Sequence, residues 1–182
     1  MRKVLYILGE LSDSDVEWMI AHGRRERRDA GAVLIQEGGE IEALYILLEG
    51  QLVVSVGEQG HELARLGAGE VVGEVSFVDL RPPSATVRVT KNALLLAIPR
   101  DVLNAKLQSD EGFAARFYRA LAVFLAYRLR DTVAQFGYGE ERQLFREEER
   151  EEDELDSNVM DKVYLAGQRF NRILKRLASE PG

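Results

Sequence analysis

Cysteine is absent from this chain of 182 residues, which excludes disulfide bonds and thiolate metal sites. Histidine occurs only as His22 and His61, and neither has a carboxylate or a second histidine at ligand spacing, so we expect no metal site. No apolar stretch approaches membrane-spanning length, and the run at residues 4–8 is too short for a signal-peptide core. We therefore expect a cytoplasmic protein that does not enter a membrane.

Positively charged residues are fewer than negatively charged ones. The chain has 24 lysines and arginines against 31 acidic residues, a formal net charge of −7. Such a surface repels a phosphate backbone, so we expect no direct DNA binding. Residues 24–28 form a short basic cluster, but short charged runs are usually solvated loops or helix ends, and this is the interpretation that we favour.

The sequence also lacks recognisable enzyme motifs. There is no Walker-type phosphate loop and no serine or cysteine nucleophile with a base partner. Glu74 has no evident second carboxylate for acid–base chemistry. We expect a protein that is not an enzyme.

Valine, leucine and isoleucine are plentiful between residues 33 and 99, in short segments separated by glycines. The expected glycine-bearing turns lie at residues 37–39, 49–51 and 57–60. This pattern predicts an antiparallel β-roll or jelly roll, closed by strands at 85–89 and 94–98. The fold class is mainly β with flanking helices.

Helical patterns lie on both sides of the predicted roll. Ser12 is expected to cap a helix, with Asp15 in the reciprocal acidic position. Apolar residues spread over more than one face of residues 113–136. One face is expected to cover the roll; the other, through Leu121 and Phe124, would meet a second subunit in a homodimer. Packing within one chain is the alternative.

The C-terminal part is predicted to be a separate element. We expect a main domain at 1–136, an acidic linker at 137–157 and an amphipathic helix at 158–182. The helix carries a basic face formed by Arg169, Arg172, Lys175 and Arg176. Docking onto the protein's own roll or dimer is favoured, and presentation to a partner protein is the alternative.

Residues 69–77 and 81–87 are the most informative about function. Glycine lets the backbone approach a ligand closely, and the amides at the corner of Gly73 and Glu74, which opens a short helical turn, are placed to hold a phosphate. Glu74 would accept hydrogen bonds from ligand hydroxyls.

These segments resemble the phosphate-binding cassette of the cyclic nucleotide-binding domain family, which includes catabolite activator-type regulators, kinase regulatory subunits and cyclic nucleotide-gated channels. Residues 31–35, 37–38 and 43–54 resemble the family's paired strands and turn glycines, and the resemblance covers residues 5–136. It implies a cyclic nucleotide-binding domain that is followed by a long helix and senses a ligand such as cyclic AMP. The implied ligand contacts are Gly73, Glu74, Val75, Ser76, Arg81, Ser84, Ala85, Thr86 and Thr132.

Two features depart from the family. Residues 137–182 are too few and too acidic for the winged helix-turn-helix domain of the transcription factors. Pro83 stands where the family has an arginine that clamps the cyclic phosphate, and proline has neither charge nor an amide hydrogen. Losing such a clamp weakens binding by roughly two to four decades. Glu74 adds a negative charge that nothing in the sequence compensates.

Two substitutes for the missing clamp are conceivable. Arg81 can fold back as a cation, or Ser84 and Ala85 can grip phosphate oxygens through the serine hydroxyl and their amides. Two functional hypotheses therefore remain open: a regulatory cyclic nucleotide sensor, or a ligand-free dimeric scaffold that binds a partner protein.

Overall fold

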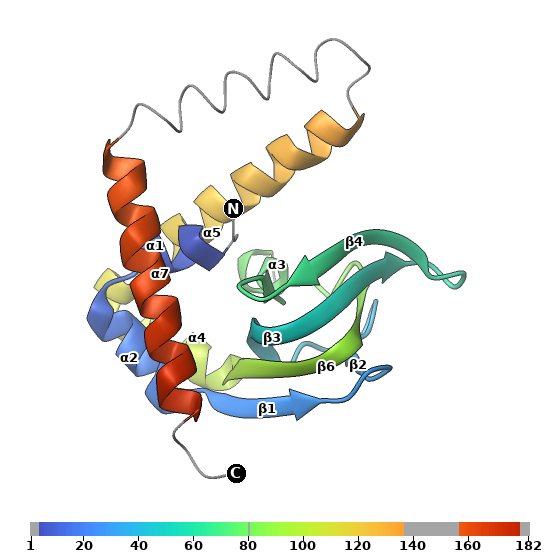
Figure 1. Cartoon of the computed structure of the whole chain (residues 1–182), viewed down its shortest axis with the longest axis horizontal. Helices are drawn as coiled ribbons and strands as arrows, with labels where there is room; N and C mark the ends of the chain where they lie inside the picture. The colour runs from blue at the N-terminus through green and yellow to red at the C-terminus, as the bar shows by residue number, and fades with distance from the viewer. Residues whose placement is uncertain (1–3, 80, 137–156, 179–182) are drawn as a thin grey trace.

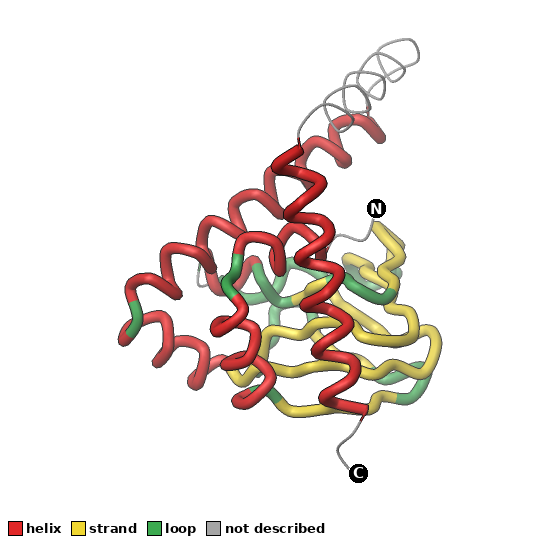
Figure 2. The backbone as a smooth tube through the Cα atoms, turned by 60° about the vertical axis from the view of Figure 1, so that its left-hand side comes forward, coloured by secondary structure: helices red, strands yellow, loops and turns green. Residues whose placement is uncertain are grey.

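The computed structural model describes residues 4–79, 81–136 and 157–178. Most of the helices gather on one side and the strands on the other (Figure 2). The chain begins with α1 (Val4–Glu10) and α2 (Asp13–His22) and then enters a six-stranded antiparallel sheet. The predicted fold class, a β-roll with flanking helices followed by a long helix and a C-terminal helix, is confirmed.

Figure 1 labels the strands and the remaining helices, whose bounds are as follows. The strands are β1 (Arg24–Arg28), β2 (Val33–Ile35), β3 (Ala43–Val56), β4 (His61–Gly67), β5 (Val71–Val72) and β6 (Thr86–Pro99). The helices are α3 (Val75–Val78), α4 (Arg100–Ser109), α5 (Glu111–Phe136) and α7 (Ser157–Ala178). No helix among the described residues is both long enough and apolar enough to span a bilayer.

The sheet is built on the pairing of β3 with β6, which runs from Ala43 opposite Pro99 to Ser55 opposite Thr86. β1 and β2 pair with β6, while β4 and β5 pair with β3. β3 and β6 supply much of the hydrophobic core, including Leu44, Ile46, Leu52, Val89, Leu95 and Ile98. Burial of this apolar area drives the folding of the roll.

Gly50 marks the point where β3 bends. The pairing with β6 shifts register around it, its φ is +96°, and a Cβ there would lie 2.4 Å from the carbonyl oxygen of Asn92. Only glycine tolerates such a bulge. The turn predicted at 49–51 is therefore wrong, because the bulge bends the strand without ending it. For the same reason the strands predicted at 85–89 and 94–98 are one strand, β6.

The basic cluster at residues 24–28 forms strand β1 rather than a loop or a helix end. β1 lies at one end of the strand order and pairs antiparallel with β6, from Arg24 opposite Ala97 to Arg28 opposite Ala93. The backbone partner offered by β6 outweighs the low strand preference of a charged run. Charged side chains also protect an edge strand against pairing with other chains.

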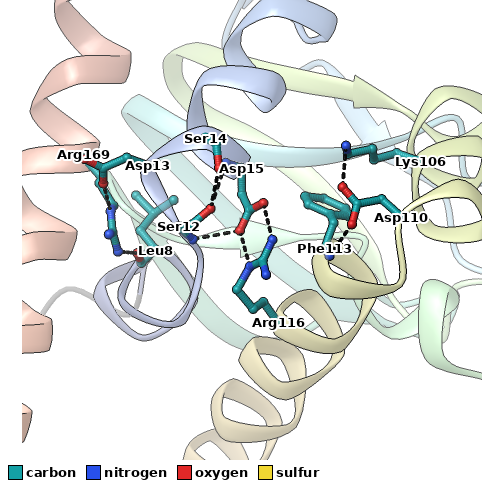
Figure 3. A network of polar contacts seen from close by, with 10 residues as sticks. All are labelled: Leu8, Ser12, Asp13, Ser14, Asp15, Lys106, Asp110, Phe113, Arg116 and Arg169. Atoms are coloured by element: carbon teal, nitrogen blue, oxygen red, sulfur yellow. Dashed lines mark hydrogen bonds and ion pairs between the residues drawn. The ribbon is translucent and has the colours of Figure 1, made fainter.

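The predicted cap of α2 is present and extends into a larger polar network (Figure 3). The amide of Asp15 donates to the Ser12 hydroxyl at 3.2 Å, and the Ser12 amide donates to the Asp15 carboxylate at 2.7 Å. Arg116 of α5 donates to both oxygens of the same carboxylate, at 2.6 and 2.8 Å. This bidentate pair joins α2 to α5, and Asp15 is almost completely buried.

Helix α5 packs against the rest of the same chain through the residues predicted for a subunit seam. Leu121 and Phe124 are 1% and 0% exposed in the single chain. The prediction that they meet a second subunit is thus wrong, because both face inward beside Phe113, Phe117 and Ala120 of the same helix. The exposed apolar residues of α5 lie on the opposite face.

Helix α7 packs along α1 and α2 (Figure 1). It buries Ala166, Phe170, Ile173 and Leu177, spaced three and four residues apart along one helical face. The buried Arg169 donates to the Leu8 carbonyl and to Asp13, both at 2.7 Å. Arg172 and Arg176 pair with Glu17, each at 3.5 Å. Helix α7 is therefore docked onto its own chain, against α1 and α2. The basic face of α7 is largely used for ion pairs within the chain.

Glu10, at the end of α1, contacts two other helices. One oxygen of its carboxylate pairs with Arg119 of α5 at 3.0 Å, and the other accepts a hydrogen bond from Lys162 of α7. Glu10 is mostly buried, whereas the two cations are more exposed. A single carboxylate therefore ties α5 and α7 together through α1.

Replacing Phe170 by alanine tests the docking of α7. The lost burial and the cavity left behind should lower the free energy of unfolding by about 3–5 kcal/mol. Tyr164→Ala is the matched control on the same helix, since Tyr164 is 67% exposed and its removal should change stability by less than about 0.5 kcal/mol. Urea unfolding curves of both variants supply the measurement, and equal losses would contradict the docked arrangement.

Candidate functional site

The corner formed by Gly73 and Glu74 joins β5 to the short helix α3. Gly73 has a φ of +91°, and a Cβ there would lie 2.9 Å from the Ala43 carbonyl oxygen of β3. Any side chain would press the corner away from the sheet, so the position requires glycine. Glu74 then occupies the N-cap position of α3, as the predicted short helical turn requires.

The Glu74 side chain is directed into the protein and is only 2% exposed. Its Oε1 accepts a hydrogen bond from Nη1 of Arg128, which lies on α5, 54 residues further along the chain. The Arg128 guanidinium also lies over the Phe124 ring, 4.7 Å from its centroid. A cation held by a carboxylate and an aromatic face is well fixed in position.

This ion pair corrects the prediction that the charge of Glu74 has no compensation. Burial raises the pKa of the Glu74 carboxyl above its usual value, and the charge of Arg128 and a backbone hydrogen bond reduce this rise without cancelling it. Breaking a buried pair of this kind by removing one partner typically costs about 3–5 kcal/mol. The pair therefore fastens the candidate cassette to the long helix.

Two other cassette residues follow Glu74 in α3 and differ in exposure. Ser76 is buried, and its carbonyl oxygen accepts a hydrogen bond of 3.4 Å from Arg100 of α4. Val75 is 43% exposed. The Arg100 guanidinium lies over the ring of Phe77, 5.8 Å from the centroid. These contacts attach α3 to the start of α4.

The second half of the cassette is anchored to the loop after β2. The carbonyl of Pro83 accepts a hydrogen bond from the Gly38 amide at 2.8 Å. The hydroxyl of Thr86 accepts hydrogen bonds from the Glu37 amide at 3.1 Å and from the Gln36 side chain at 3.3 Å. The hydroxyl of Thr86 is thus directed toward residues 36 and 37, and the loop is held through its backbone.

The remaining predicted contacts are less constrained. Arg81 and Ser84 are exposed, and Ala85 is half-buried. The Arg81 amide donates to the Asp79 side chain at 3.1 Å, which tightens the turn after α3. Thr132 belongs to α5, but its side chain lies outside the described residues. A ligand role for these four residues stays a prediction.

Arg128 is the residue of this site that the sequence did not reveal. Its position held a usable signal, because it lies one helical turn before Thr132, the residue that the family resemblance places near a ligand. A basic residue four positions earlier shares that helix face. Within the described residues, no cluster of histidine and carboxylate side chains is suited to hold a metal ion.

Comparisons with known proteins bear on the fold that carries this site. The family model described as "Cyclic nucleotide-binding domain" matches residues 25–110. Lysophospholipase nte1 of Aspergillus fumigatus is 30% identical over 108 residues, which cover 58% of this chain but only 7% of the fungal protein. The chain therefore spans less than a tenth of the length of that relative.

Two solved structures are also similar. A cyclic nucleotide-binding domain from Methylobacillus flagellatus aligns with a TM-score of 0.63 at 23% identity, covering 76% of this chain and 84% of that one. The regulatory domain of Toxoplasma gondii PKA, crystallised with cAMP, aligns with a TM-score of 0.52 at 27% identity, covering 57% and 42%. Residues 25–110 of this chain therefore match the cyclic nucleotide-binding domain family.

The Glu74 pKa makes a stability prediction with a definite sign. Because the pKa is raised in the folded state, the unfolded chain ionises first as pH increases above the usual value of 4.5, and ionisation of Glu74 then favours unfolding. The variant Glu74→Gln has no carboxyl group at this position, so its stability lacks this dependence on pH. The stability of Glu74→Gln relative to the wild type should therefore rise with pH above that value, as measured by urea unfolding across a pH series.

Glu58, exposed in the turn after β3, supplies the control variant Glu58→Gln. Curves for Glu74→Gln and the wild type that stay parallel over the whole series would show that the folded-state pKa is not raised.

Proposed function

We propose that this protein is a non-enzymatic regulatory module of the cytoplasm that binds a cyclic nucleotide at the corner of Gly73 and Glu74. The observation that carries the proposal is the buried pair between Glu74 of the cassette and Arg128 of α5. A cassette carboxylate that is joined to the long helix supplies two parts of a sensor: an acceptor for ligand hydroxyls and a connection to an element that responds.

A ligand hydroxyl that donates to Glu74 competes for the same oxygens as Arg128. If the ligand takes one carboxylate oxygen, Arg128 either keeps the other or moves with α5. Arg128 is also a cation near the cassette, which partly offsets the positive charge lost at Pro83. The cAMP in the Toxoplasma gondii complex makes cyclic AMP the first ligand to test.

Pro83 and the existing pair support a second candidate, a ligand-free scaffold. Glu74 has its partner within the chain, so the buried carboxylate does not depend on a ligand for its hydrogen bond. In this alternative the pair is a structural tie, and the surface of α5 or α7 binds another protein. The two candidates differ in whether cyclic AMP stabilises the protein.

We also propose that the protein is a homodimer, through a face of α5 different from the one first expected. Six exposed residues recur at spacings of three and four along α5 and define an apolar stripe: Ala115, Tyr118, Ala122, Ala126, Leu129 and Val133. Three alanines and three larger apolar or aromatic residues make up this stripe, which suits close packing against a second α5. Leu129 is 65% exposed and Val133 is 55% exposed in the single chain.

Restoring the missing arginine tests the sensor proposal. The carbonyl contact of Pro83 to Gly38 is available to any residue, so Pro83→Arg adds a guanidinium without removing that hydrogen bond. One bidentate contact should tighten cyclic AMP binding by roughly two decades. Isothermal titration of the wild type, Pro83→Arg and Glu74→Gln measures this, and Glu74→Gln should weaken binding because it removes the charge that receives ligand hydroxyls.

Thermal unfolding with added cyclic AMP gives an independent readout. A ligand at about 100 times its Kd should stabilise the protein by about 2.7 kcal/mol. Failure of both the wild type and Pro83→Arg to bind would reject the sensor and leave the scaffold.

Leu129→Asp tests the dimer. An unpaired carboxylate in an apolar seam is costly, so the mass measured by light scattering should fall from two chains to one. Arg130→Asp is the matched control, since Arg130 is exposed but lies off the apolar stripe. A wild-type mass of one chain, or an unchanged mass for Leu129→Asp, would contradict the proposed seam.

A further inference from the structure

A cavity of about 650 Å³ lies between the β1 edge of the roll and the C-terminal end of α7. None of the predicted cassette residues lines it. One wall comes from β1 and from the chain around the β3–β6 bulge, and the other comes from Leu174 and Lys175 of α7. Figure 1 shows the end of α7 beside β1, at the lower edge of the roll.

The cavity is basic in an acidic protein. Four cationic residues line it, Arg25, Arg27, Arg28 and Lys175, against the two acidic residues Asp29 and Glu49, and Arg28 is paired with Glu26 at 2.7 Å. This surplus of positive charge stands against a net charge of −7 for the whole chain. A hollow in which one sign of charge is in excess raises the local concentration of the opposite ion.

The basic side chains approach from different directions. Arg25 and Arg27 are two residues apart on β1 and therefore share one face of the strand. Lys175 comes from the opposite wall, on α7. Guanidinium groups bind phosphate oxygens in pairs of parallel hydrogen bonds, whereas an ammonium acts as a compact point charge. This set suits a tetrahedral anion with several oxygens.

The cavity also has an apolar part. Leu94 and Leu174, one from each wall, are half-buried, and Ala93 beside them is buried. Ligand pockets commonly combine apolar lining with a few polar groups that fix orientation. The apolar lining favours an organic anion over a bare inorganic ion.

We propose that this cavity binds a small organic phosphate, with its phosphate against Arg25, Arg27 and Lys175 and its apolar part against Leu94 and Leu174. The site is separate from the cassette and does not rest on the cyclic nucleotide proposal. Because α7 forms one wall, an occupied site holds α7 against the roll. Binding there therefore stabilises the docked tail by mass action.

Phenyl phosphate is a suitable probe because it combines a phosphate with an apolar ring and has no ribose for Glu74. Isothermal titration at low ionic strength should show tighter binding of phenyl phosphate than of inorganic phosphate. Arg27→Gln and Lys175→Gln should each weaken phenyl phosphate binding about tenfold, the equivalent of one charged contact. Circular dichroism verifies that each variant is folded.

Matched controls lie on the same two elements. Arg24→Gln on β1 and Arg176→Gln on α7 remove the same kind of charge outside the lining and should leave binding unchanged. Glu74→Gln should also leave it unchanged, which separates this site from the cassette. Absence of binding at millimolar phenyl phosphate, or equal losses in lining and control variants, would overturn the proposal.

The phosphate of a lipid headgroup could bind to the same side chains as the phosphate of a soluble ligand. Co-sedimentation with vesicles containing phosphatidic acid distinguishes it from a soluble ligand. Vesicle binding that depends on Arg27 and Lys175, without phenyl phosphate binding, would overturn the small-ligand proposal in favour of a lipid headgroup. Phenyl phosphate binding without vesicle binding supports the proposal as stated.

Discussion

The pairing of β3 with β6 is the constraint on which the rest of the molecule depends. These two long strands carry every other strand of the sheet, and the bulge at Gly50 lets them bend while their backbone groups remain paired. β5 pairs with β3 and brings Gly73 against Ala43, while Thr86 begins β6. Both halves of the cassette are therefore placed by one ladder of hydrogen bonds.

Helix α5 is positioned on this frame by ion pairs of unequal strength. Asp15 and Glu74 are 4% and 2% exposed, and each accepts hydrogen bonds from an arginine of α5. The pair of Arg119 with Glu10 is weaker, because Arg119 is 69% exposed and surface pairs contribute about 0–1 kcal/mol. Water competes far less for the two buried carboxylates, and their arginines set where α5 lies along the roll.

Much of the fold could be predicted from local patterns. The capping residues Ser12 and Asp15, the two helical apolar patterns and the glycine corner at residue 73 all act over short stretches of chain, and the structure has these features. The continuity of β3 and β6 could not be predicted, because a glycine bulge and a glycine turn have the same local signature. Whether Gly50 ends a strand depends on Asn92, which lies on another strand.

The candidate site, too, could be predicted only where its signals are local in the sequence. The place of Glu74 was readable from its neighbours, but its pairing with Arg128 joins residues 54 positions apart and depends on how α5 lies on the roll. Leu121 and Phe124 were assigned to a seam because periodicity identifies apolar faces without saying which of them the chain itself covers. The basic run of β1 was misread because its backbone partner, β6, is distant in sequence.

The shared carboxylate of Glu10 has an evolutionary consequence. Since one anion serves Arg119 and Lys162 on two different helices, a reversal of its charge would place three cations together. Restoring both pairs would then need changes on α5 and on α7. Among relatives that keep both helices, residues 10, 119 and 162 should therefore change together. In a relative without α7, only the pair with Arg119 would constrain Glu10.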